Sequence, residues 1–119
     1  MNIEAYRSMI KENVVQSMKD FMEFAEDDCG FTLKDVEECE AILTRYLDAL
    51  TSIDEVTDER IMTEVKTVVL ELNDLNERTD YSIIETEERE AIWEIIQESA
   101  VECGLSDPED DITEEWRDW

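Results

Sequence analysis

Acidic side chains are the residues of this chain most able to do chemistry, because its 119 residues include 35 Asp and Glu and no His. Without His, the chain lacks the commonest general base and the commonest zinc ligand. It also lacks every nucleophile arrangement that pairs Ser or Cys with His. No glycine-rich phosphate loop is present either. Any catalysis would therefore require carboxylates that hold a metal ion.

One pair of acidic motifs has a spacing suited to such a site. Glu37-x-x-Glu40 is followed, after fourteen intervening residues, by Glu55-x-x-Asp58. The pattern resembles the paired acidic motif of the all-α nucleotide pyrophosphohydrolases, which bind magnesium between helices, and Mg²⁺ accepts such ligands. The same motif recurs elsewhere in this acidic chain, so it has little specificity. A magnesium-dependent nucleotide hydrolase is therefore an alternative, and the prediction is a non-catalytic protein without a cofactor or a metal site.

The net charge predicts the kind of partner. The formal net charge is −25 at pH 7, which repels nucleic acid and anionic lipid and speeds the encounter with basic proteins. We therefore expect a basic protein partner, with no direct binding of nucleic acid or membrane. General solubility is the competing explanation of the charge. No apolar run is long enough to span a membrane, no secretory signal is recognisable, and the three Cys lack CxxC spacing, so a cytoplasmic location is expected.

A ridge of carboxylates is predicted on the last long helix. Glu87, Glu90, Glu94 and Glu98 recur at three- and four-residue steps, opposite the apolar Ile92 and Ile96. Like charges at such steps destabilise a helix by a few tenths of a kcal/mol per pair. An ordinary solvated face would mix positive and negative residues. The ridge is therefore predicted to bind a partner.

A second group of acids crowds the end of the first predicted helix. The helix dipole opposes negative charge there by roughly 0.3–1 kcal/mol per residue. Residues that destabilise a helix locally, with no compensating gain elsewhere in the structure, tend to mark functional sites. The group, also predicted to bind the partner, consists of Glu23, Glu26, Asp27 and Asp28.

The C-terminal tail combines acids with tryptophans. Trp is the residue type most enriched in interface hot spots, so the tail is predicted to contribute to the same partner surface. The alternative is that both tryptophans pack back onto the helices and complete the core. The predicted tail residues are Asp110, Asp111, Glu114, Glu115, Trp116 and Trp119.

Apolar residues at helical spacing predict an all-α fold. Helices are expected over 3–26, 32–50, 57–78 and 86–103, with Asn2 and Thr32 as N-caps and with Gly30 and Gly104 closing the first and last of them. With only 2 Gly and 1 Pro, the prediction is an antiparallel four-helix bundle over residues 1–105. The tail, residues 106–119, is expected to add a short helix with Ile112, Trp116 and Trp119 on one side.

The joint between the last two predicted helices contains two asparagines. Asn73 and Asn76 lie near the end of the third helix, where Asn can adopt left-handed geometry or bond carbonyl groups. Tyr81, Ile83 and Ile84 are expected to cover the core. Glu85, Glu87 and Glu88 lie at the start of the next helix, where the helix dipole favours negative charge.

In charge and helix content the chain resembles two groups of protein inhibitor. One is the small acidic helical immunity proteins that neutralise a bacterium's own nuclease toxin, and the other is the phage-borne DNA mimics that block restriction or CRISPR enzymes. The Tyr-Tyr-Pro recognition segment of colicin-nuclease immunity proteins is absent. Because Arg7, Lys11 and Lys19 dilute the acid of the first helix, the acid is local. The resemblance therefore implies an immunity-type or antitoxin-type inhibitor, with the DNA mimic as the alternative.

Overall fold

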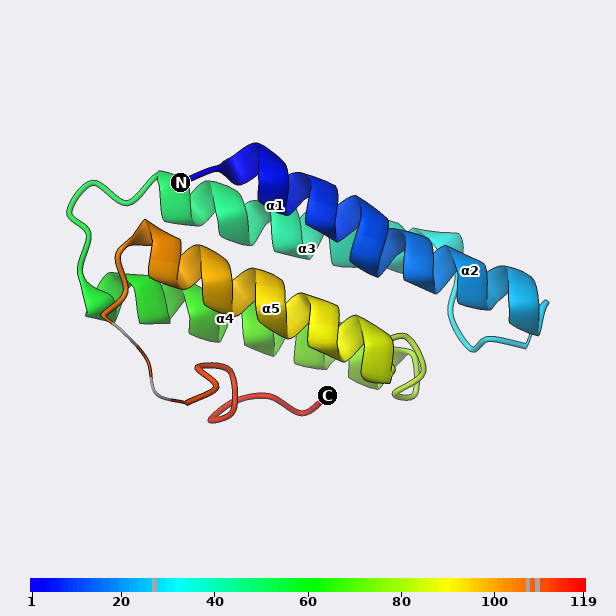
Figure 1. Ribbon diagram of the computed structural model, residues 1–119. Coiled ribbons are helices and arrows are strands. Elements are labelled where there is room, and N and C mark those ends of the chain that lie inside the picture. Colours follow the sequence, from blue (N-terminus) through cyan, green and yellow to red (C-terminus); the bar gives the residue numbers. More distant parts are fainter. Residues whose placement is uncertain (27, 107, 109) are drawn as a thin grey trace.

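The computed structural model describes residues 1–26, 28–106, 108 and 110–119, and it is all-α (Figure 1). No strand occurs within these ranges, which confirms the predicted class. Four long helical segments lie along one another in a body of 46 × 27 × 22 Å. They are the continuous segment formed by α1 (Ile3–Met9), the π-helical η1 (Ile10–Val15) and α2 (Gln16–Ala25), followed by α3 (Leu33–Thr51), α4 (Asp58–Arg78) and α5 (Thr86–Cys103).

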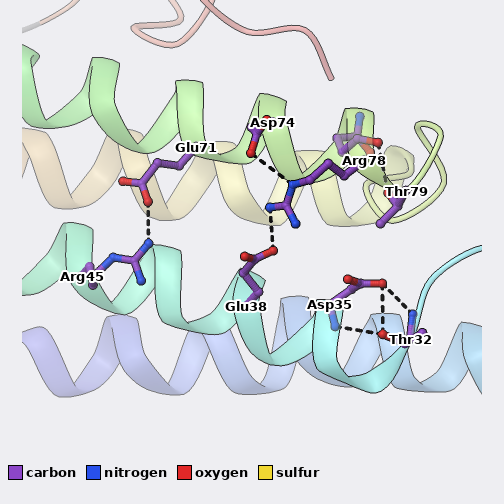
Figure 2. A network of polar contacts seen from close by, with 9 residues as sticks. Thr32, Asp35, Glu38, Arg45, Glu71, Asp74, Arg78 and Thr79 are labelled. Carbon is purple, nitrogen blue, oxygen red and sulfur yellow. Dashed lines mark hydrogen bonds and ion pairs between the residues drawn. The ribbon is translucent and has the colours of Figure 1, made fainter.

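Side-chain caps fix where three of these segments begin. The Asn2 side chain accepts a hydrogen bond from the backbone N–H of Ala5, at 3.3 Å. Thr32 and Asp35 form the predicted capping box (Figure 2), in which each side chain accepts from the other's backbone N–H, at 3.3 and 2.9 Å. At the start of α4 the Thr57 side chain accepts from the backbone N–H of Arg60, at 3.1 Å. These caps satisfy N–H groups that have no partner within the helix.

The two glycines have different roles, and only Gly104 closes a helix. Gly104 follows α5 with a φ of +129° and donates its N–H to the carbonyl of Val101, as predicted. Gly30 does not end the first helical segment, which already stops at Ala25. It has a φ of +89° within the following loop, and a Cβ there would lie 2.6 Å from the Ser82 Oγ. Gly30 is therefore required for the approach of this loop to the α4–α5 connection.

A six-residue π segment interrupts the first helix and changes which side chains it buries. Val14 and Val15 are both buried in η1. A π segment accommodates one extra residue, so the residues after it are rotated by about 100° relative to a continuous α-helix. Consequently Met22 packs against the core and Phe21 is 38 % exposed. Phe21, three residues after the buried Met18, is therefore partly exposed to solvent.

The core lies between the helical segments, with polar links across it. The Tyr46 hydroxyl of α3 donates to the Ile96 carbonyl of α5, at 2.9 Å. On the surface of α3 and α4, Arg45 pairs with Glu71, and Arg78 pairs with both Glu38 and Asp74 (Figure 2). The largest fully buried side chains are Ile10, Met18, Leu43, Leu47, Leu50, Ile61, Leu72, Leu75, Ile83, Ile92, Ile95 and Ile96.

The two asparagines of α4 hold neighbouring segments in place. Asn76 is 2 % exposed, and its side-chain oxygen accepts from the backbone N–H of Ile84, at 3.2 Å. Its own carbonyl accepts from the N–H of Tyr81, at 2.7 Å. The predicted left-handed geometry lies instead at Asp80 and Tyr81, with φ of +56° and +60°. Ile84 is buried as expected, but Tyr81 is 51 % exposed and does not cover the core.

The described part of the tail forms turns, so the predicted short tail helix is wrong. Asn73 donates to the carbonyl of Trp116, at 2.7 Å, and accepts from the N–H of Asp118, at 2.9 Å. Side chains of the helices thus bind backbone groups that a tail helix would use internally, and one helical turn is in any case unfavourable to nucleate. The tail lies beside α4 and α5 (Figure 1).

Candidate acidic binding surfaces

The predicted ridge on α5 is fully on the surface. Glu87, Glu90, Glu94 and Glu98, the α5 ridge, are all exposed. Ile92 and Ile96 on the opposite side of the helix are buried. Within the described part of the chain, none of the four carboxylates forms an ion pair. The structure therefore places the four carboxylates in one accessible row, and their binding role remains a prediction.

The second predicted group lies at the end of the first helical segment. Glu23, Glu26 and Asp28 are exposed there, and Asp27 lies outside the described residues. Glu26 has a φ of +56° and ends α2. Glu23 lies in the last turn of α2, and Glu26 and Asp28 follow the helix end; their role also remains a prediction.

The tail residues divide into exposed acids and packed side chains. Asp110, Glu114 and Glu115 are exposed, whereas Asp111 accepts from the Thr113 backbone, at 2.8 Å, and pairs with Arg117, at 3.3 Å. Asp111 thus has a structural role in the tail turn.

Trp116 and Trp119 pack against the core cluster and are partly buried. The Lys66 ammonium lies 6.0 Å from the Trp116 ring centre, and the Arg117 guanidinium lies 5.4 Å from the Trp119 ring centre. This arrangement corresponds to the alternative in which the tryptophans complete the packing of the helices. Their predicted contact with a partner would be limited to the faces that remain exposed.

A groove between α2 and the start of α5 was missed by the sequence analysis. The α2–α5 groove has a volume of about 630 Å³. Five of the nine residues lining it are carboxylates, and none is Lys or Arg. Phe24 is 86 % exposed at this groove. The lining residues are Glu12, Ser17, Asp20, Phe21, Phe24, Glu85, Thr86, Glu87 and Glu88.

Glu88 is buried in this region, whereas its neighbours Glu85 and Glu87 are exposed. It is 5 % exposed and accepts hydrogen bonds from the Ser17 hydroxyl and from the Glu85 backbone N–H. These bonds satisfy a carboxylate that would be costly to bury alone. Burial raises the pKa of the nearby Cys39 thiol to about 12, and the negative charge of Glu88 adds to that rise. Glu88 therefore links α2 to α5 beneath the groove.

A second carboxylate links α1 to α5 at the opposite end of α5. Glu102 accepts hydrogen bonds from the Tyr6 hydroxyl and from the Asn2 backbone N–H. These bonds favour the charged form and lower the pKa of Glu102. Burial, followed by the bond to Glu102, raises the pKa of Tyr6.

The acidic motifs that suggested a magnesium site have other contacts. Asp58 accepts from the Ser106 backbone N–H, at 3.0 Å, and Glu55 lies 3.9 Å from the Arg60 guanidinium. Among the residues with described positions, no group of three or more Cys, Asp or Glu is placed to hold a metal ion. The structure therefore provides no support for the hydrolase alternative. None of the described helices is long and apolar enough to cross a membrane.

Comparison of the chain with protein-family models, with curated proteins and with solved structures finds no match. The functional argument therefore depends on the surface itself.

Proposed function

We propose that this protein is an immunity-type or antitoxin-type inhibitor that neutralises a basic partner protein by binding it through an acidic face. In this proposal an antiparallel four-helix bundle presents the α5 ridge and the neighbouring carboxylates to the partner. The observation that supports it most directly is the uneven compensation of charge over the surface. Five carboxylates on α1, α3 and α4 have cationic partners within the chain, and those of the α5 ridge have none among the described residues.

Three arginines pair with carboxylates on α1, α3 and α4. Arg7 bridges Glu4 and Asp48, at 2.7 and 3.0 Å, which neutralises acid on α1 and α3. The pairs of Arg45 and Arg78 do the same between α3 and α4 (Figure 2). The α5 ridge has no such compensation among the described residues and keeps its full negative charge. Such a charge attracts basic proteins and accelerates their association.

The spacing of charge favours a protein partner over mimicry of DNA. The α5 ridge extends over eleven residue steps, or about 16 Å of helix, and holds four carboxylates. Duplex DNA of that length would carry about ten phosphate charges, because it has one per ~1.7 Å of axis. Paired carboxylates on α3 and α4 do not supply the missing density. An arginine- or lysine-lined cleft of a toxin could instead be matched residue by residue.

The test is capture of the partner at low salt from a lysate of the cell that makes this protein, followed by binding of the purified captured protein. We expect a basic protein whose activity is inhibited and whose affinity falls steeply between about 50 and about 300 mM NaCl. Neutralising the α5 ridge with Glu87→Gln, Glu90→Gln, Glu94→Gln and Glu98→Gln should weaken binding by about ten-fold or more.

A matched variant controls for the total charge. Asp54→Asn, Glu37→Gln, Glu59→Gln and Glu77→Gln change the net charge by the same amount at exposed positions on other parts of the chain. This variant should bind within about three-fold of the unmodified chain. Equal losses in the two variants, or an affinity that does not respond to salt, would contradict the proposal.

A further inference from the structure

Phe24 is the large apolar side chain with the least structural explanation. It is 86 % exposed, while the neighbouring Phe21 is 38 % exposed and stacks on Phe31 with ring centres 6.2 Å apart. Phe21 and Phe24 are three residues apart on α2 and therefore lie on one side of the helix. An exposed aromatic pair in a concave site is typical of a surface that another molecule covers.

The polar surroundings of this pair specify the charge of that molecule. The carboxylates of Glu12 and Asp20 lie on the helical segment that contains Phe24, and Glu85 and Glu87 lie across the groove at the start of α5. No ion pair to any of these four is present in the described part of the chain. A ligand with Arg or Lys side chains on both flanks would compensate them.

Other occupants match the groove poorly. A second copy of this chain would bring a net charge of −25 against an equal charge, and nucleic acid would be repelled in the same way. A wholly polar basic segment would leave Phe24 in water. A small apolar ligand would leave the carboxylates unpaired. Only a ligand that is both basic and apolar satisfies the two features together.

We propose that the α2–α5 groove is the docking site for a segment of the partner protein that carries Arg or Lys on both sides of an apolar side chain. The apolar side chain packs on Phe24 and Phe21, and the cations contact Glu12 and Asp20 on one wall and Glu85 and Glu87 on the other. This inference rests on the proposed function, since it assumes a basic protein partner. It adds the position of the anchor and the chemistry of the segment that binds there.

The experiment measures binding of two fluorescein-labelled helical peptides by fluorescence anisotropy. One peptide has Leu at i, i+3, i+4 and i+7 among Arg and Lys residues, and the other has Ser in place of each Leu. The leucine peptide should bind the unmodified chain more tightly than the serine peptide. Phe24→Ser should weaken the leucine peptide by about ten-fold and leave the serine peptide unchanged.

Two control variants isolate the groove from general effects. Leu70→Ser removes an apolar side chain that is 46 % exposed on α4, and it should change the affinity of the leucine peptide by less than about two-fold. Glu12→Gln with Asp20→Asn should weaken both peptides more than the equally charged Glu59→Gln with Glu77→Gln. Amide NMR shifts on adding the leucine peptide should be largest at Ser17 and Thr86, which line the groove, and small at Thr67.

The outcomes separate this inference from the proposed function. Equal affinity of Phe24→Ser and Leu70→Ser for the leucine peptide would overturn the docking site. The docking site would also be overturned if the captured partner bound the Phe24→Ser variant normally but did not bind the variant with the neutralised α5 ridge. The proposed function would then stand. If the partner is not basic but the leucine peptide still depends on Phe24 and on the groove acids, the proposed function fails and the docking site is retained.

Discussion

Replacing Asn76 with Ala tests the hydrogen bond that joins α4 to the following loop. Asn76 is 2 % exposed and Ile84 is 6 % exposed, so no water replaces the side-chain oxygen that accepts from the Ile84 N–H, at 3.2 Å. A buried donor left without an acceptor costs about 1–3 kcal/mol. The Asn76→Ala chain should therefore lose about that amount of unfolding free energy, although Ala has the higher helix propensity.

Urea unfolding followed by circular dichroism at 222 nm measures the loss. For a slope of about 2 kcal/mol/M, typical of a small protein, the midpoint should fall by roughly 0.5–1.5 M. Asn13→Ala is the matched control, because Asn13 is exposed on the first helical segment and should shift the midpoint by no more than about 0.3 M. The argument would be refuted if Asn76→Ala kept the midpoint of the unmodified chain or behaved like Asn13→Ala.

Two further substitutions test the tail and the link between α1 and α5. Asn73→Ala removes the hydrogen bonds to Trp116 and Asp118. Tryptophan emission should shift to the red and trypsin should cleave faster after Arg117, whereas unchanged emission and cleavage would show that the other contacts of the tail fix it. Tyr6→Phe removes the hydrogen bond that lowers the pKa of Glu102. Above the pKa of this carboxyl in the unfolded chain, the bond contributes its full stabilisation. That contribution is lost as the pH falls through the lower pKa of the folded chain. The stability difference between Tyr6→Phe and the unmodified chain should therefore be constant near neutral pH and shrink in acid; a difference that is the same in acid would contradict this assignment.

Local signals in the sequence were sufficient to predict the helices. The all-α class followed from apolar spacing, and the starts of α1 and α3 followed from Asn2 and from the Thr32–Asp35 capping box, all of which act within four residues of chain. The exposure of the α5 ridge was predicted for the same reason, since its carboxylates lie opposite the buried Ile92 and Ile96 of one helix.

Contacts between distant segments could not be predicted in this way. Glu88 is buried because Ser17, 71 residues away, donates to it, and no periodicity marks that pairing. Asn73 binds tail residues more than 40 positions away, which is why it appeared to be a local helix-end residue. The groove was missed because Phe24 lies outside the row of buried apolar residues on its helix, and because the opposite wall of the groove comes from α5. Such features depend on how helices pack against one another, and residue spacing within one sequence does not reveal that packing.

The π segment η1 sets the rotational phase of everything that follows it in the first helix. Rotation by about 100° moves Met22 toward the core and leaves Phe24, beside Asp20, at the groove. A chain one residue shorter at Asn13 and α-helical throughout would keep that phase. An α-helical chain of the present length would turn Phe24 away from α5 and dismantle the groove while keeping every carboxylate. The binding surface is thus determined as much by one additional backbone residue as by the acids that line it.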